Sequence, residues 1–253
     1  TNVSCGITAT TTGTGVVGIG YQALMSHTTG QMNTASGYLS MTDATTAQYN
    51  AAFGSCSLHA LTTGIRNTAL GHAPLRANTT GQDNVGVGFA TLLVNTTGCR
   101  NTGSGSYALY TNTTGSRNTG LGLCALYANT TANNNTAVGE GAMKSNTTGS
   151  YNTGIGRNSL QATTTGICNT GLGYGSLFAN TTGCFNTASG YMAAQANTTA
   201  PPSVTSVQEL PLGNAFIVGG LDVAATSCNS PLVALATNLP FIDHNLSNVL
   251  CVL

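Results

Sequence analysis

Ten asparagines in the chain begin an Asn-x-Thr or Asn-x-Ser triplet, which is the acceptor sequence for N-linked glycans. Seven of them lie at multiples of 17 residues from one another. If units of that length stack as strands do, glycans on successive units would lie roughly 4.8 Å apart, too close for branched sugars. A ladder of side-chain amides hydrogen-bonded along the stack explains the same residues without modification, so we prefer it and keep glycans at a subset of sites as the alternative. The ten residues are Asn2, Asn78, Asn95, Asn112, Asn129, Asn134, Asn146, Asn180, Asn197 and Asn245.

Eight cysteines offer disulfide chemistry. Cys168 and Cys184 fall at neighbouring positions of successive 17-residue units, so they come within disulfide range if the local corner allows it. Cys228 and Cys251 could close the C-terminal segment in the same way. Bridges between chains and buried free thiols are the alternatives. The chain has no C-x-x-C pair and no Cys/His spacing typical of zinc, so we expect no metal site.

Catalytic chemistry finds little support in the residue pattern. The segment Gly13-Thr-Gly15-Val-Val-Gly18 matches G-x-G-x-x-G, but no strand-turn-helix pattern surrounds it and no acidic residue follows before Asp43. We interpret it as the glycine spacing of the repeat itself. The histidines are scattered, and no two carboxylates recur at a spacing that would build an acid/base pair, so we expect no enzyme and no cofactor. The four histidines are His27, His59, His72 and His244.

The elements that must position these residues come from a 17-residue repeat. With Thr10 as position one, eleven complete copies run to Ala196, and a twelfth begins at Asn197. The consensus is N-T-T-G-x-x-N-T-[GA]-[LIV]-G-x-x-[AS]-L-x-A. Positions two and three are Thr, and position eleven is Gly, in every complete copy. Such a short fixed period is typical of repeat architectures, in which each unit is completed only by its neighbours.

The residue types of the repeat favour strands over helices. Glycines at positions four, nine and eleven would each cost a helix up to about 1 kcal/mol relative to Ala. Two β-favouring runs, Asn-Thr-Gly-Leu and Ala-Leu-x-Ala-Asn-Thr-Thr, alternate with glycines that suit tight corners. The sequence therefore predicts an all-β parallel β-solenoid, or β-roll, of eleven coils and about 53 Å in length. The large apolar residues at positions ten and fifteen are predicted to fill its core.

Three segments are expected. Residues 1–9 form an N-terminal strand or cap, residues 10–199 form the solenoid, and residues 200–253 form a C-terminal β-rich cap or subunit-docking segment. The last segment abandons the period and becomes apolar and β-branched. Because proteins cover open sheet edges, we expect either terminal segment to close the rod or to add a strand to a neighbouring molecule.

The amino-acid composition of the chain limits the kinds of partner that it can bind. Only 5% of residues are charged, against about 25% in ordinary globular domains, and the net charge is zero. Without a basic cluster the chain lacks the electrostatic surface that nucleic acids require. No apolar run approaches the roughly 20 residues of a membrane span. Since the chain starts at a Thr, we expect a processed or trimmed extracellular form, with a virion component as the alternative.

Aromatic and Thr residues suggest two further surfaces. Tyr and Phe gather at positions twelve and sixteen, where they form either strips that stack sugars or ladders that pack on themselves. Adjacent Thr residues of a strand point to opposite faces, so only one of the invariant pair faces outward. Position eight, which is Thr in eight of the eleven complete copies, supplies a second outward column if its strand shares that face. Ice binding is therefore kept as a third interpretation.

Two stretches carry a resemblance to a known family. Asn-Thr-Ala-Val-Gly-Glu-Gly-Ala-Met at 135–143 and Gly-Ile-Gly-Tyr-Gln-Ala-Leu at 18–24 resemble the head repeats of YadA-like trimeric autotransporter adhesins. They are also similar to the 17-residue arrays of bacterial and viral tail-fibre-domain proteins. The resemblance covers residues 10–199. It implies a left-handed parallel β-roll, usually trimeric, that serves as a stalk or adhesive surface.

Taken with the composition, the repeat predicts an extracellular structural or adhesive fibre subunit. We expect it to associate with itself, as a homotrimer or a head-to-tail filament, and to contact surface carbohydrate or a receptor. A receptor-binding phage or virus tail fibre is the alternative, and an ice-binding β-solenoid is the third candidate.

Overall fold

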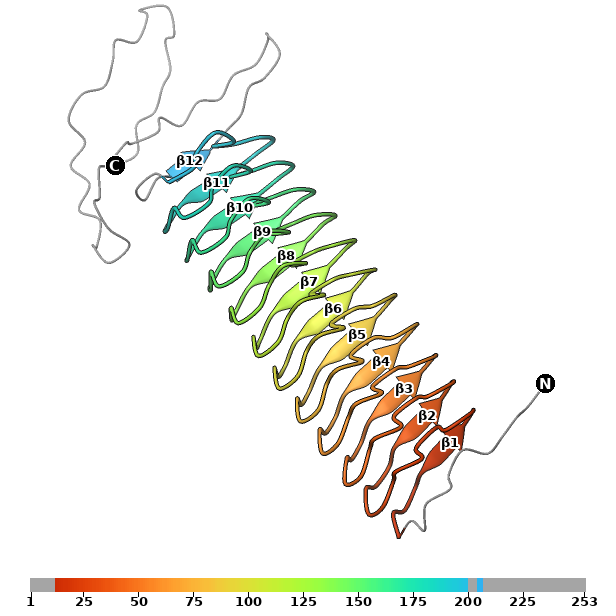
Figure 1. Ribbon diagram of the computed structural model, residues 1–253. Coiled ribbons are helices and arrows are strands. Elements are labelled where there is room, and N and C mark those ends of the chain that lie inside the picture. The colour runs from red at the N-terminus through yellow and green to blue at the C-terminus, as the bar shows by residue number, and fades with distance from the viewer. Residues whose placement is uncertain (1–11, 200–203, 207–253) are drawn as a thin grey trace, which may run out of the picture.

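The computed structural model describes residues 12–199 and 204–206, which form an all-β rod without helices (Figure 1). Twelve three-residue strands pair in chain order into one parallel sheet, and each begins at position eight of its repeat. Each of the first eleven strands pairs with the residues 17 positions further on, as Thr170 does with Thr187. The predicted parallel β-solenoid is confirmed. The strands are β1 Val17–Ile19, β2 Thr34–Ser36, β3 Ala51–Phe53, β4 Thr68–Leu70, β5 Val85–Val87, β6 Thr102–Ser104, β7 Thr119–Leu121, β8 Thr136–Val138, β9 Thr153–Ile155, β10 Thr170–Leu172, β11 Thr187–Ser189 and β12 Val204–Ser206.

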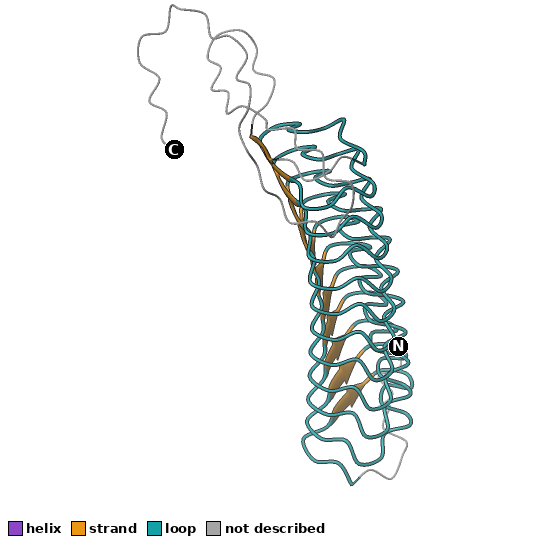
Figure 2. Ribbon diagram, turned by 90° about the vertical axis from the view of Figure 1, so that its left-hand side faces the viewer, coloured by secondary structure: helices purple, strands orange, loops and turns teal. Residues whose placement is uncertain are grey.

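Each coil of the solenoid contains one strand rather than the two that were predicted. The strands follow one side of the rod, and turns and bends make up the rest of each coil (Figure 2). The second β-favouring run is not extended, because residues at positions thirteen and fifteen have positive φ angles. Leu75 and Leu109, for example, have φ values of 52° and 53°. That left-handed conformation is incompatible with a β-strand, so the run folds as a turn.

The core contains position fifteen but not position ten. Position-fifteen side chains such as Leu109 and Met143 are fully buried, as predicted. The prediction for position ten was wrong, because Leu70 is 50% exposed while Ala69 beside it is buried. Strand residues alternate between faces, and here position nine takes the inward face. A Cβ added to Gly120 at position nine would lie only 3.3 Å from Cγ of Leu109, so there is room inside only for Gly or Ala.

The invariant glycine of position eleven is explained by two constraints at once. Gly122 has a φ angle of 128°, which L-residues rarely adopt. A Cβ at this position would also lie 2.7 Å from the carbonyl carbon and oxygen of Gly139 in the next coil. Both the turn and the close approach of successive coils therefore require glycine.

Two ladders of polar side chains join successive coils. At position seven, Oδ1 of Asn101 accepts hydrogen bonds from the backbone N–H of Asn118 at 3.0 Å and from its Nδ2 at 3.2 Å. At position two, Oγ1 of Thr96 donates to the carbonyl of Thr113 at 3.1 Å. The first ladder runs from Asn33 to Asn186 and the second from Thr28 to Thr198. The polar groups of these two ladders thus find their partners in the next coil.

The solenoid sheet extends past the predicted end of the repeat domain at residue 199. Strand β12 keeps the register, because Ser189 of β11 pairs with Ser206. The twelfth repeat therefore reaches its strand in spite of Pro201 and Pro202. The predicted cap of residues 1–9 and most of the segment 200–253 lie outside the described residues.

Candidate functional site

The outward side of the sheet is a regular surface along the described rod. We define the sheet face as the side chains at positions eight and ten of β1 to β11, which lie on either side of the inward position nine. Position eight is Thr in eight of these strands, and none of the residues at either position is charged. Position ten is Ser in β2, β6 and β11 and carries a large apolar side chain in the other eight. Those eight residues are Ile19, Phe53, Leu70, Val87, Leu121, Val138, Ile155 and Leu172.

The apolar column at position ten is only partly covered by its own chain. The exposed fractions of Ile19, Phe53, Leu70, Ile155 and Leu172 lie between 38% and 50%. Residues one coil apart on the column are partners in the sheet register, as Phe53 and Leu70 are, yet their outer surfaces stay open. The sequence pattern identified these residues as apolar and periodic, but assigned them to the core instead of the surface.

The aromatic residues pack mainly on one another. The rings of Tyr21 and Tyr38 stack with centroids 5.4 Å apart, and those of Tyr110 and Tyr127 stack at 5.1 Å. Tyr174 and Tyr191 form a third stacked pair. Each ring covers one face of its neighbour, yet Tyr21, Tyr38 and Tyr191 remain 53–57% exposed. The rows therefore pack on themselves in pairs and still present aromatic surface, and sugar stacking stays a prediction.

A further exposed row, at position six, was not singled out as a surface for contact. It includes Met32, Tyr49, Tyr151 and Phe185, whose exposed fractions range from 41% to 63%. Each of these residues has a positive φ angle, from 52° at Met32 to 62° at Tyr151. The turn conformation pushes the side chain away from the coil. The residue types of this row vary from copy to copy, and the sequence signal for its exposure is that four copies carry Arg or Asp at this position.

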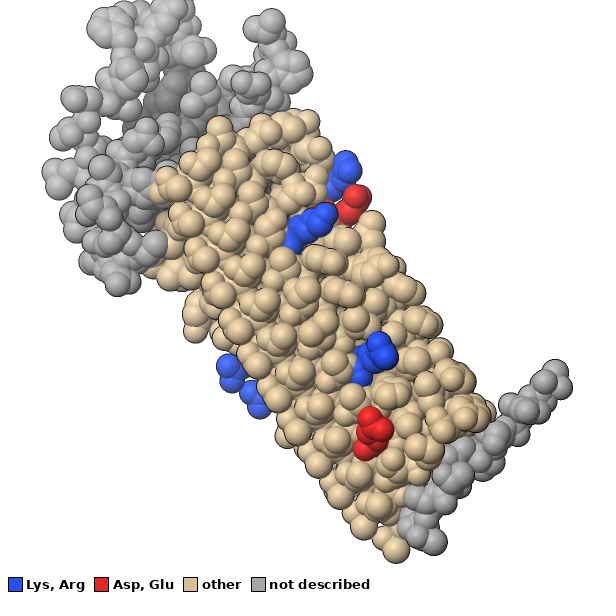
Figure 3. All heavy atoms as spheres, in the orientation of Figure 1, with Lys and Arg blue, Asp and Glu red and all other residues tan. Residues whose placement is uncertain are grey.

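Charged groups are sparse, and two Arg–carboxylate pairs join successive coils. In the view of Figure 3 they form isolated points on an otherwise uncharged surface. Arg66 donates two hydrogen bonds to Asp83, from Nε at 2.6 Å and from a terminal nitrogen at 3.1 Å, which lowers the pKa of that carboxyl group. Arg157 and Glu140 lie 3.2 Å apart. All four residues are substantially exposed, so these pairs contribute little to stability.

The sequon asparagines that recur every 17 residues form a third internal ladder. Nδ2 of Asn95 donates to Oδ1 of Asn78 at 2.8 Å and to the carbonyl of Gly98 at 3.0 Å. A glycan would have to be attached to that same buried nitrogen. Asn134 and Asn197 are partly exposed, whereas Asn2 and Asn245 lie outside the described residues. The fully buried sequon residues are Asn78, Asn95, Asn112, Asn129, Asn146 and Asn180.

The predicted disulfide between Cys168 and Cys184 is not formed, because Cys168 carries a free thiol. Cys184 is itself disulfide-bonded, so Cys168 is not its partner. Cys184 is buried, and its Sγ accepts a hydrogen bond from the backbone N–H of Ile167 at 3.4 Å, whereas Cys168 at the next position has a φ angle of 56°. The predicted pair Cys228 and Cys251 lies outside the described residues.

The histidines occupy separate environments. His27 is buried at position one, 3.3 Å from Nδ2 of Asn33, and burial lowers its pKa. His72 stacks on Phe89, and His59 lies 3.9 Å from Asp43. Within residues 12–199 and 204–206, no three His, Cys, Asp or Glu side chains gather as a metal site. The Gly13–Gly18 segment leads into strand β1, and no helix follows it.

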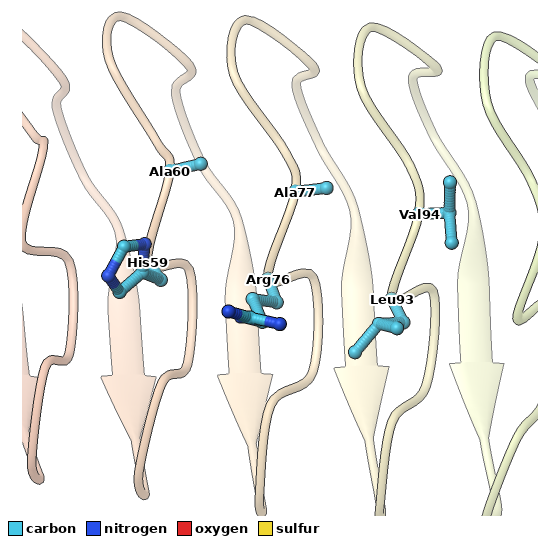
Figure 4. A pocket seen from close by; sticks show the side chains of 6 residues that line it. All are labelled: His59, Ala60, Arg76, Ala77, Leu93 and Val94. Carbon is cyan, nitrogen blue, oxygen red and sulfur yellow. The ribbon is translucent and has the colours of Figure 1, made fainter.

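A shallow hollow of about 240 Å³ lies on the turn side of three successive coils. His59, Arg76 and Leu93 form one row of its lining, and Ala60, Ala77 and Val94 form the neighbouring row (Figure 4). The hollow is open to solvent and offers two basic groups at its rim.

These features define the class of the protein as a parallel β-solenoid repeat protein. Comparisons with protein-family models, with curated proteins and with solved structures give no match to the chain. In the described part of the chain, no helix is long and apolar enough to cross a membrane.

Proposed function

We propose that the chain is an extracellular structural or adhesive fibre subunit that associates with itself. One observation carries this proposal: the recurring residues of the repeat are used to hold one coil to the next. Thr at position two and Asn at position seven form the ladders, and Gly at position eleven allows the close approach of coils. A repeat of this kind builds a rod, and the positions that vary lie mostly on its outside.

Self-association is supported by the exposed apolar column at position ten. A rod with large aliphatic side chains along one side gains stability when that side is removed from water, at roughly 25 cal/mol per Å² of apolar surface. Surface carbohydrate or a receptor is the further partner of an adhesive rod. A receptor-binding tail fibre would use the same rod and differ in what its terminal segments bind.

Ice binding has one favourable observation and one unfavourable one. Positions eight and ten do share the sheet face, so a column of Thr is displayed there. Its companion column is aliphatic, and the second exposed column of Thr, at position three, lies on a bend. The two Thr columns are therefore not carried by one strand, and we rank this function below the fibre.

The proposal is tested by the native mass of the chain in solution, with electron microscopy of the same sample. We expect particles heavier than the 25.4 kDa chain that contain rods about 53 Å long. Repeating the measurement with reductant separates association through surfaces from association through disulfides. A monomer at micromolar concentration would refute self-association, and a monomer that also slows ice growth would replace the proposal with the ice-binding one.

A further inference from the structure

We propose that a second copy of the chain covers the sheet face as a two-fold dimer with antiparallel rods. This inference rests on the self-association proposed above and names the surface and the geometry. Its starting point is that large apolar side chains occupy position ten in eight of the eleven coils, and that five of them are exposed and the other three are half-buried. Figure 2 shows that the strands follow one side of the rod, so their outward residues form a single face.

The periodicity of the sheet face identifies the partner. Side chains at position ten recur at the spacing of stacked strands, roughly 4.8 Å. A partner contacts the whole column only if its own side chains recur at that spacing. Another copy of this rod has the matching period over its whole length, whereas a globular surface would meet only a few coils.

The size of the face is adequate for a stable pair. The eleven strands β1 to β11, spaced at roughly 4.8 Å and three residues wide, give a face of about 53 by 10 Å, or about 530 Å² on each copy. Two copies would therefore bury about 1,100 Å², which passes the threshold of about 1,000 Å² for specific association. No charged side chain at position eight or ten of β1 to β11 opposes the contact.

The composition of the two columns selects the orientation. A two-fold axis along the rod would reverse the strands of one copy, so the Thr-rich column at position eight would face the apolar column at position ten. A two-fold axis parallel to the strands keeps the strand direction and reverses the rods, so position ten faces position ten. Apolar surface is then buried against apolar surface, and Thr faces Thr.

The order of large and small residues selects the register. If β6 lies on the axis, β1 faces β11 and β2 faces β10. Ile19 then faces Ser189, Ser36 faces Leu172, and Ser104 faces its own copy. Each Ser away from the axis is thus matched by a large apolar residue, which lets the two columns interdigitate.

Cysteine cross-linking tests the orientation and register. Ser104→Cys should form a disulfide-linked dimer when an oxidant is added, because the residue faces its own copy on the axis. Ser36→Cys alone should not, since its counterpart lies eight coils away, but an equimolar mixture of Ser36→Cys and Leu172→Cys should. The unsubstituted chain under the same oxidant controls for its native thiols. Cross-linking of Ser36→Cys by itself would mean parallel rods and would overturn the inference.

A measurement of native mass tests whether the sheet face forms the dimer contact. Leu70→Lys places a charge in the centre of the contact and should convert a dimer, twice the 25.4 kDa chain mass, to a monomer. Thr114→Lys, an exposed position-three residue on a bend, should leave the dimer intact. Circular dichroism confirms that both variants are folded. A trimer, or an oligomer that survives Leu70→Lys, would overturn this inference while leaving self-association standing, whereas a monomeric unsubstituted chain would refute both.

Discussion

The position-seven asparagine ladder gives a prediction whose magnitude follows from the structure. The side chain of Asn101 takes part in four hydrogen bonds. Its Oδ1 accepts from the backbone N–H and the Nδ2 of Asn118, and its Nδ2 donates to Oδ1 of Asn84 at 3.2 Å and to the carbonyl of Gly115 at 2.8 Å. Asn101→Ala removes all four and leaves the backbone N–H of Asn118 buried without its acceptor.

The expected loss is about 4 kcal/mol of unfolding free energy. Each hydrogen bond contributes a net of about 0.5–1.5 kcal/mol, and an orphaned buried donor costs about 1–3 kcal/mol. The contributions are not additive, so the sum of the upper values overstates the effect. Asn101→Asp should be at least as destabilising at neutral pH, because a carboxylate cannot donate to Asn84 or Gly115, and its deficit should shrink in acid as protonation restores a donor.

The measurement is urea unfolding followed by far-ultraviolet circular dichroism at fixed protein concentration, together with hydrogen exchange. Because each coil contacts only its neighbours, exchange should quicken most in the coils that contain Asn101 and Asn118. Arg100→Ala, an exposed change in the same coil, is the matched control and should stay within about 0.5 kcal/mol. A loss below about 1 kcal/mol for Asn101→Ala would refute the view that the ladder holds the coils together.

Three further changes test other features of the coil. Gly122→Ala should destabilise the protein by at least about 3 kcal/mol or prevent folding, because the added Cβ would collide with the next coil and the residue has a φ of 128°. The control is Gly120→Ala, which should cost far less because other coils have Ala at that position. Equal effects of the two changes in thermal unfolding would contradict this explanation. Burial lowers the pKa of His27 in the folded protein below the value near 6.5 of the unfolded chain. The contribution of neutral His27 to stability is therefore fully present above pH 6.5 and is lost as the pH falls through the folded-state pKa. His27→Asn should flatten this part of the pH–stability profile, and an unchanged profile would show that another group is responsible. Tyr151→Asn should stabilise the protein by up to about 1 kcal/mol, measured by urea unfolding. Tyr151 is 63% exposed and has a φ of 62°, a conformation that Asn tolerates better than Tyr. A loss of stability would show that the backbone at Tyr151 is not strained.

The 17-residue period, together with the residue types of the repeat, was sufficient to predict the architecture. Identical residues that recur at one short spacing are satisfied best when each pairs with its own copy in the next coil, which requires parallel strands in register. The burial of Leu109 and its equivalents also followed from the pattern, because a large apolar residue that recurs in nearly every copy is most stable in the core. An asparagine ladder was foreseeable for the same reason, since a buried amide can bond to an identical amide above and below it.

The phase of the strand within the coil was decided only by the tertiary structure. Alternation predicts that position nine or position ten points inward, but not which one. The choice depends on the far side of the coil, where left-handed φ angles at positions thirteen and fifteen direct Leu109 against Gly120 and leave space only for a small residue. Leu70 and the other position-ten residues therefore lie on the surface. The contact that excludes them from the core, between positions fifteen and nine, joins residues that are distant along the repeat, so the local sequence pattern does not reveal it.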